Sequence, residues 1–170
     1  QDGGIRTVGL NGGAVKADTS KFYGSSDDFE EAKSDAFTIK FEQDISDNTI
    51  FKNTSRYAKT NQEMLLTSPF NYSTTALTVD RRMHARWQEN EILTNQSNFS
   101  TQVQTGMLLH KISTGIELTK ESQLTKNYTA QNAQITSLYN PTNISWDALT
   151  FSGQKSDGET TTVGAYLFDS

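Results

Sequence analysis

Apolar and polar residues alternate along the stretch FTIKFEQDISDNTIFKNTSRYAK at 37–59. In its first part the apolar residues share one parity and the polar residues the other: Phe37, Ile39 and Phe41 against Thr38, Lys40 and Glu42. Successive side chains of a strand point to opposite faces, so this period of two predicts a strand with one apolar face. The triplet SDN at 46–48 supplies turn residues, because Asp and Asn tolerate left-handed geometry. A second strand at 49–66 is predicted to complete a hairpin.

The stretch 77–103 carries the clearest pattern. Eleven of the twelve even positions from Asp80 to Gln102 are polar. The odd positions hold the apolar residues Val79, Met83, Ala85, Trp87, Leu93, Phe99 and Val103. A helix would mix the two sets, whereas a strand separates them. Two more strands are predicted, at 107–126 and at 160–168.

The predicted connections alternate between long and short. Residues 1–34 and 127–158 are rich in Gly, Ser, Asp and Asn and predict long loops, and Pro69 in SPFNYS predicts a break after the second strand. Only short turns are predicted at SDN and at QTG, 104–106. Strict alternation of this kind is typical of a transmembrane β-barrel, which has short periplasmic turns and long extracellular loops.

Strand length supports the same architecture. Globular strands usually have about 3 to 10 residues, and the predicted strands 49–66, 77–103 and 107–126 are longer. About 9 to 11 tilted residues cross the hydrocarbon. The segment from Leu93 to Val103 has no charge and is predicted to cross it, whereas the segment from Arg81 to Glu91 is heavily charged and would lie outside.

Composition changes this picture little. The chain has 170 residues, of which 34% are hydrophobic, and its mean hydropathy is −0.63. These values are typical of a soluble or partly disordered protein, but a barrel strand needs only every second residue to be apolar. No apolar run is long enough for a transmembrane helix. The absence of cysteine excludes disulfides and thiolate metal sites, and the net charge of −5 argues against a nucleic-acid partner.

Four segments, in order, resemble the barrel of TonB-dependent ferric siderophore receptors of the catecholate type. The first, at 22–60, contains an FYG element, an alternating strand, an SDN turn and an N-x-S-R-Y strand. The others are ENEILTNQSNF at 89–99, LLHKISTGIELTKES at 108–122 and TTVGAYLFDS at 161–170. Together they cover most of the chain.

The resemblance implies that residues 1–170 are part of a β-barrel domain. We expect an all-β, antiparallel transmembrane segment of about five long strands from the first half of the barrel, without the plug domain and the remaining strands. The chain begins with Gln1 and ends in a predicted strand, which indicates a piece of a longer protein. Alone, five strands with unpaired edges are predicted not to transport.

The resemblance also implies a function and partners. The whole receptor would bind a ferric siderophore at its extracellular loops in the outer membrane of a Gram-negative bacterium. Import would depend on the TonB–ExbB–ExbD system acting through the plug, and outer-membrane lipid would surround the barrel. No enzymatic activity, catalytic residue, cofactor or resident metal is expected.

Candidate ligand-binding residues are cationic or aromatic. Ferric catecholate complexes are anionic and aromatic, so guanidinium groups and aromatic rings near the barrel mouth would suit them. The candidates are Arg81, Arg82, Arg86 and Trp87 in the third predicted strand, with Tyr139 and Trp146 in the long loop. A structural alternative is that these residues stabilise the loops, with the arginines paired to Glu89 and Glu91.

Other chemistry has weaker support. His84 and His110 are the only histidines, and they lie on different predicted strands, so surface positions are expected rather than metal ligation. The acidic run DDFEE at 27–31 lacks the spacing of a calcium loop and predicts a solvated loop.

A second fold hypothesis remains open at this stage, namely a soluble β-sandwich or adhesin that recognises glycans with its loops. The two hypotheses differ in the environment of the apolar face. A barrel exposes one continuous convex apolar surface, whereas a sandwich buries it against a second sheet. The diagnostic residues are Phe37, Ile39, Phe41, Ile112, Ile116 and Leu118.

Overall fold

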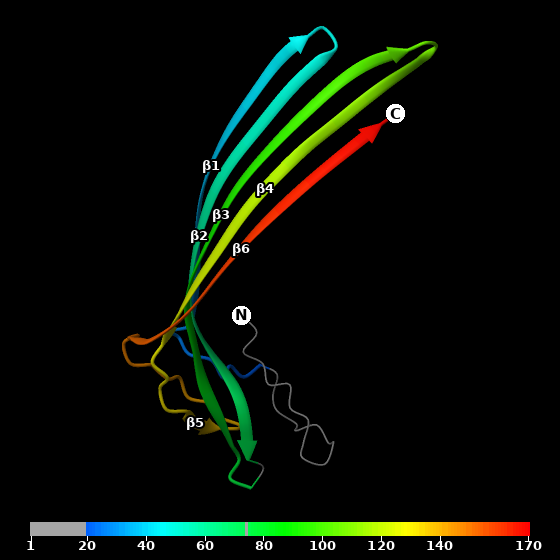
Figure 1. The fold of residues 1–170 in the computed structure, drawn as a ribbon. Helices are drawn as coiled ribbons and strands as arrows, with labels where there is room; N and C mark the ends of the chain where they lie inside the picture. The colour runs from blue at the N-terminus through cyan, green and yellow to red at the C-terminus, as the bar shows by residue number, and fades with distance from the viewer. Residues whose placement is uncertain (1–19, 74) are drawn as a thin grey trace. The chain divides into compact units, whose positions relative to one another are not determined.

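The fold, seen in a computed structural model that describes residues 20–73 and 75–170, is built from β-strands (Figure 1). The strands are β1 (Phe29–Ser46), β2 (Thr49–Ser73), β3 (Thr78–Thr105), β4 (Leu108–Tyr128), β5 (Gln134–Ser137) and β6 (Phe151–Asp169). They form a six-stranded sheet in the order β1-β2-β3-β4-β6, and the short β5 pairs antiparallel with β3. The predicted all-β antiparallel class with long strands is therefore confirmed.

Two strands begin earlier than the sequence predicts. The first begins at Phe29, so part of the acidic run DDFEE is strand rather than loop. Residues 1–19 of the predicted loop lie outside the described residues. The last begins at Phe151, so SGQKSDG is also strand. Gly, Ser and Asp disfavour strands by themselves. Here pairing of β6 with its neighbour β4 in the sheet outweighs this preference. The side chains of Lys120 on β4 and Glu159 on β6 also meet in an exposed ion pair of 3.0 Å.

The predicted break at Pro69 is wrong, because β2 continues to Ser73 and only residues 74–77 separate it from β3. This connection is therefore short, contrary to the predicted alternation of short and long connections. The contact between the Ser34 and Thr60 hydroxyls, 3.0 Å, sets the register of β1 and β2 and places Pro69 beyond the first residue of β1. A proline is tolerated where a strand has no neighbour on one side.

The chain divides into two compact units. The described part of the first unit comprises residues 20–32, 62–87 and 125–155, and the second comprises 33–61, 88–124 and 156–170, with residue 74 excepted. No helix among the described residues is long and apolar enough to cross a membrane.

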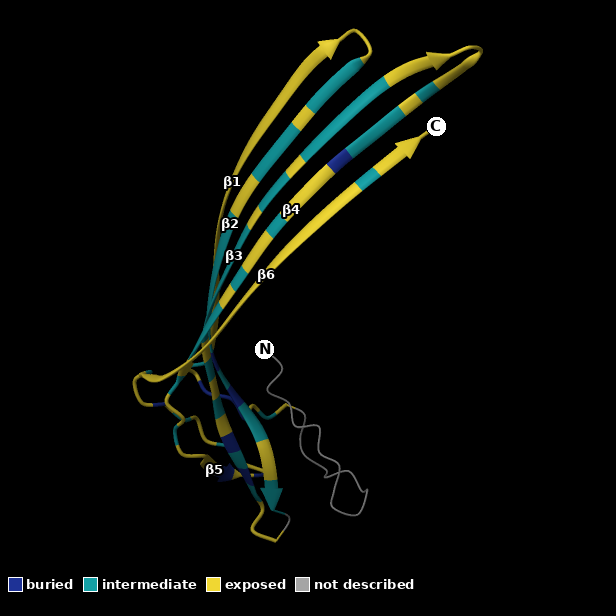
Figure 2. Ribbon diagram, in the orientation of Figure 1, coloured by how far each residue is buried: buried dark blue, intermediate teal, exposed yellow. Residues whose placement is uncertain are grey.

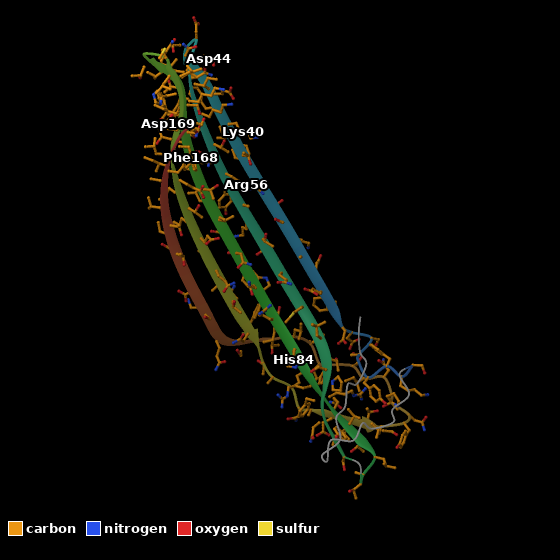
Figure 3. The ribbon with its side chains drawn as sticks, turned by 90° about the vertical axis from the view of Figure 1, so that its right-hand side faces the viewer. Lys40, Asp44, Arg56, His84, Phe168 and Asp169 are labelled. Carbon is orange, nitrogen blue, oxygen red and sulfur yellow. The ribbon has the colours of Figure 1, made fainter. Side chains whose placement is uncertain are left out.

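Cross-strand contacts define the two faces of the second unit. Phe41 contacts Phe51 with ring centroids 6.3 Å apart, which places both on the face we call the apolar face. On the opposite, polar face Lys52 pairs with Glu42 at 3.1 Å. Figure 3 labels Lys40 and Arg56 on the two neighbouring strands β1 and β2. Even positions of β1 and β2 thus carry the polar face.

The apolar face of the second unit is open. Five of the six diagnostic residues are exposed and Ile112 is half-buried: Phe37 is 65% exposed, Ile39 56%, Phe41 53%, Ile116 60% and Leu118 47%. Figure 2 shows β1 and β6 exposed along almost their whole length. All strands of the described residues belong to one sheet. The β-sandwich hypothesis is therefore wrong, since it requires a second sheet over these side chains.

Polar side chains on the apolar face form hydrogen bonds with one another. The Asn53 and Asn95 side-chain amides each donate to the other's oxygen at 3.2 Å. The Asn53 amide also donates to Ser97 Oγ at 2.8 Å, and the Asn95 amide to Ser55 Oγ at 2.7 Å. Because the amides find partners within the sheet, these polar side chains can lie on a face without water.

On the polar face, β4 and β6 approach closely at Gly115. A Cβ at this position would lie 2.5 Å from the Tyr166 Cζ and Oη atoms and 2.7 Å from the Ser97 carbonyl oxygen. The Tyr166 hydroxyl in turn lies 2.8 Å from the Asn98 side-chain amide, which donates to it. The absence of a side chain at 115 thus allows Tyr166 to cover β4.

The interior of the first unit is small. Tyr23, Val79 and Leu138 are almost fully buried and pack together, with Tyr72 against them. The Tyr23 hydroxyl donates to the Leu138 carbonyl oxygen, and the Leu138 N–H donates to the Leu77 carbonyl oxygen at 2.8 Å. These contacts fix the segment that follows β5 against the start of β3.

A hydrogen-bonded group, here called the Trp146 network, joins three segments of the first unit. The buried Trp146 indole N–H donates to Thr67 Oγ1 at 2.7 Å, and this hydroxyl donates to Asp28 Oδ1, also at 2.7 Å. The Trp146 backbone N–H donates to Asp27 Oδ2 at 3.1 Å. The acidic residues Asp27 and Asp28 therefore orient the long loop and are not simply solvated.

We predict that Gly115→Ala destabilises the full-length barrel by about 1–3 kcal/mol, because the new methyl group overlaps backbone of β3. The measurement is the midpoint of denaturant-induced unfolding of the purified full-length protein. Gly164→Ala is the matched control, since a Cβ there meets no atom within 4 Å. Equal midpoints for wild type and Gly115→Ala would contradict the close approach of β4 and β6.

We predict that Trp146→Phe loosens the loop between β5 and β6, because it leaves the buried Thr67 hydroxyl without its donor at a cost of about 1–2 kcal/mol. Limited proteolysis of the full-length protein should cut this loop about fivefold to thirtyfold faster. Tyr139→Phe is the control, because that ring is 49% exposed. An unchanged cleavage rate for Trp146→Phe would show that the indole hydrogen bond does not hold the loop.

Candidate functional site

The even positions at the start of β3 form a cationic row in the first unit. Arg82, His84 and Arg86 are exposed and lie at alternate positions, roughly 7 Å apart along the strand. The Arg82 guanidinium lies 4.1 Å from the centroid of the Phe70 ring, and His84 Nε2 lies 2.9 Å from Ser68 Oγ. Figure 3 labels His84 at this part of β3. Among the described residues no carboxylate pairs with Arg82 or Arg86, so both can attract an anion.

Arg81 belongs to the other side of β3 and is fully buried. One terminal nitrogen, Nη1, donates to the Thr142 carbonyl oxygen at 2.7 Å. The other guanidinium nitrogens, Nε and Nη2, have no partner among the described residues. Burial lowers the pKa of Arg81 from its ordinary value. In this conformation Arg81 holds the loop after β5 and offers no surface to a ligand.

The six predicted site residues therefore do not converge on one surface. Arg82 and Arg86 share the cationic row, whereas Arg81 is buried beneath the loop after β5 and Trp146 is a buried residue of that loop. Tyr139 is exposed on the same loop, with its backbone N–H bonded to Ser137 Oγ at 3.3 Å. The side of β3 on which each arginine lies follows from its odd or even position in the sequence. The burial of Arg81, in contrast, depends on how the loop folds.

Trp87 lies in a group that we call the aromatic–lysine cluster, formed by Trp87, Lys126, Tyr128 and Phe151. Lys126 Nζ lies 4.5 Å from the Trp87 ring centroid and 5.6 Å from that of Phe151. Tyr128 stacks on Phe151 with centroids 4.6 Å apart. Its hydroxyl donates to Glu63, and burial followed by this hydrogen bond raises the pKa of Tyr128 to about 12.

Sequence reasoning missed the other three members of this cluster. Lys126 and Tyr128 are both at even positions, so the alternation along β4 could have placed them on one face. No such indication exists for Phe151, because this residue lies in a predicted loop.

Glu89 and Glu91 do not pair with the arginines. Lys59 Nζ lies 2.9 Å from Glu89 Oε2 and 3.1 Å from Glu91 Oε1. The ion pairs expected in the structural alternative are therefore not observed, although Arg81 does hold the loop, as that alternative also expected. Arg82 and Arg86 remain without a carboxylate among the described residues.

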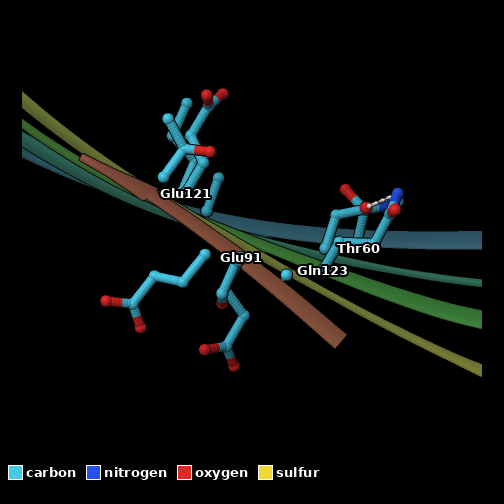
Figure 4. A pocket seen from close by; sticks show the side chains of 11 residues that line it. Thr60, Glu91, Glu121 and Gln123 are labelled. Atoms are coloured by element: carbon cyan, nitrogen blue, oxygen red, sulfur yellow. Dashed lines mark hydrogen bonds between the residues drawn. The ribbon is translucent and has the colours of Figure 1, made fainter. Parts of the chain in front are cut away.

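A shallow hollow of about 540 Å³ lies on the polar face of the second unit (Figure 4). Its lining includes Thr60, Asn90, Glu121 and Gln123, and the Gln123 amide donates to Asn90 Oδ1 at 3.0 Å. Figure 4 shows Glu121 and Glu91 extending to opposite sides of the sheet. The hollow presents hydroxyl, amide and carboxylate groups but no nucleophile placed beside a base.

The histidines do not form a metal centre. His84 bonds a serine hydroxyl, and His110 Nδ1 lies 2.8 Å from Asp169 Oδ2. Within the described residues no group of three or more His, Cys, Asp or Glu side chains is placed to hold a metal ion.

The chain is similar to known receptors over almost its whole length. It is 32% identical over 190 aligned positions to the catecholate siderophore receptor Fiu of Escherichia coli (strain K12), covering 99% of this chain and 25% of Fiu. It is 30% identical over 103 positions to the probable TonB-dependent siderophore receptor PiuA of Acinetobacter baumannii, covering 59% of this chain and 14% of PiuA. The chain thus spans about a quarter of the length of Fiu. No family model matches it.

The fold agrees with this similarity. The crystal structure of the ferric-catecholate import receptor Fiu from E. coli K12 in a closed form matches 99% of this chain and 27% of that one, with a TM-score of 0.82 at 31% identity. An open form of the same receptor gives a TM-score of 0.83 at 32% identity and covers 29% of that chain.

The strands of this sheet therefore correspond to part of the barrel of a transport receptor, and the receptors of this family are not enzymes. The chain belongs to the family of TonB-dependent siderophore receptors, β-barrel proteins of the outer membrane of Gram-negative bacteria.

Proposed function

We propose that this chain is part of a receptor that binds a ferric siderophore of the catecholate type at its extracellular loops and imports it with energy supplied through TonB. Family membership supports the general class, and the names of the relatives refer to catecholate siderophores. The chain covers a quarter of Fiu. The ligand and the partners of the whole receptor are therefore part of our proposal.

The cationic row on β3 is the observation that carries this proposal. Arg82 and Arg86 are exposed guanidinium groups without a carboxylate partner among the described residues, and Phe70 lies against Arg82. Guanidinium groups donate several hydrogen bonds to anionic oxygens, and ring faces stack on aromatic ligands. A ferric catecholate presents both anionic oxygens and aromatic rings.

The other predicted residues have different parts in this proposal. Tyr139 is exposed and can stack on a ligand ring. Arg81 and Trp146 are buried and act indirectly, by holding the loop that carries Tyr139. Trp87 lies on the side of β3 opposite to Arg82 and Arg86.

Residues 1–170 form, in this proposal, one section of the barrel wall. The strands β1 and β6 end the sheet order and have a free backbone edge among the described residues, to which further barrel strands would pair. The apolar face meets outer-membrane lipid, and the polar face meets the lumen, where a plug domain contacts the TonB–ExbB–ExbD system.

We predict that Arg82→Ala and Arg86→Ala in the full-length receptor each weaken the binding of a ferric catecholate about tenfold or more, because a charge-assisted hydrogen bond contributes about 1.5–3 kcal/mol. The dissociation constant is measured by fluorescence quenching on the purified receptor. Lys155→Ala, which removes an exposed cation of the same unit outside the row, is the control.

Two results would count against the proposal. Unchanged affinity in both arginine variants would remove the cationic row from the binding site. Uptake that persists in cells without TonB would contradict the mechanism of import, even if binding remained normal.

A further inference from the structure

His84 occupies the middle of the cationic row, and the proposed function gives it no role. It is exposed and lies on the same side of β3 as Arg82 and Arg86, because all three positions are even. The two arginines are four residues apart, so a ligand that contacts both guanidinium groups spans about 14 Å along the strand. Such a ligand passes over the imidazole of His84.

One ring nitrogen of His84 is engaged and the other is not. Nε2 lies 2.9 Å from Ser68 Oγ, whereas Nδ1 makes no hydrogen bond with a described residue. Nδ1 can donate to an anionic oxygen only when it carries a proton, because otherwise it presents a lone pair. In the neutral ring this requires Nε2 to accept from the Ser68 hydroxyl. In the imidazolium both nitrogens donate, Nε2 to Ser68 and Nδ1 to a ligand.

The charged groups nearest to His84 on its own strand are cationic. Arg82 and Arg86 flank it on the same side of β3, and the one carboxylate on that side, Asp80, is four residues away and accepts a side-chain amide from β2. The contact of His84 on β2, Ser68, is uncharged. Among the described residues no carboxylate pairs with the imidazole, so negative charge beside it has to come from a ligand.

We infer that His84 is a third ligand-binding residue of the cationic row, which donates from Nδ1 to an anionic oxygen of the ferric siderophore and takes up a proton when the ligand binds. This inference rests on the proposed function, because it concerns the same site. Histidine is the side chain that ordinarily changes its charge between pH 5 and 8. A charged donor bonds an anionic oxygen more strongly than a neutral donor does, so the bound ligand favours the imidazolium.

Proton linkage sets the direction of the pH dependence. When the ligand-bound receptor holds more protons than the free receptor, affinity rises as the pH falls. The difference between a charge-assisted and a neutral hydrogen bond corresponds to about a fivefold change in the dissociation constant. The change is expected between pH 8 and pH 6, because an unperturbed imidazole titrates near pH 6.5.

The chain offers a matched control for His84, because His110 is its only other histidine. His110 belongs to the second unit, where its Nδ1 lies 2.8 Å from Asp169 Oδ2. His84→Gln keeps a side-chain N–H donor but cannot take up a proton in this pH range. His110→Gln removes the same titratable group outside the cationic row.

The experiment is isothermal titration calorimetry of the full-length receptor purified in detergent, with the ferric complex of a synthetic tris-catecholate whose catechols are covalently linked. Titrations at pH 7 in two buffers of different ionisation enthalpy give the number of protons taken up. Wild type and His110→Gln should take up about half a proton more than His84→Gln. They should bind about fivefold more tightly than His84→Gln at pH 6 and equally at pH 8. Protonation of the ligand itself cancels in this comparison.

Three outcomes would overturn the inference while leaving the proposed function in place. These are equal proton uptake by wild type and His84→Gln, the same loss of affinity in His84→Gln at pH 6 and pH 8, or the same loss of proton uptake in His110→Gln. The second of them would indicate that the ring only shapes the site. Absence of binding by the wild type at pH 8 would contradict the proposed function, and the inference with it.

Discussion

The alternation of side chains along hydrogen-bonded strands is the constraint on which the rest of this structure depends. A strand in lipid must bond its backbone to a neighbour, and each residue then has a fixed face. A register shift of one residue would exchange Phe41 with Lys40 or Glu42 and place charge in hydrocarbon. In the second unit, cross-strand contacts on each face hold this register: Phe41 with Phe51 on one side and Glu42 with Lys52 on the other.

The open apolar face is consistent only with an apolar environment. Side chains such as Phe37 and Ile116 are more than half exposed. Each large apolar side chain left in water forgoes about 1.5–3 kcal/mol of burial free energy. The amide pair of Asn53 and Asn95 is also compatible with an apolar environment, because each side chain forms a hydrogen bond with the other on the adjacent strand and needs no water. The low mean hydropathy of the chain comes from the opposite, polar face and from the loops.

Periodicity predicted the long strands well, because the face of each residue in β2, β3 and β4 depends on local alternation. It failed where a neighbouring strand outweighs local propensity, as in the glycine-containing start of β6, and at Pro69, which lies beyond the first residue of β1. The short β5 gave no signal in the sequence. The side of β3 on which each arginine lies followed from its odd or even position. The burial of Arg81 and the contacts of Lys126 and Phe151 depend on how the loops fold, and the loop sequences have no periodic pattern that would predict this.

The most direct test of the account concerns the two faces of the wall. The chain has no cysteine, so single cysteines can be introduced in this region of the full-length receptor and labelled with a fluorophore. Labels at Ile39→Cys and Lys40→Cys, reconstituted in vesicles with brominated lipid chains, report contact with hydrocarbon. We predict strong quenching at position 39 and little at position 40. Equal quenching at both positions, or stronger quenching at 40, would contradict the assignment of the two faces.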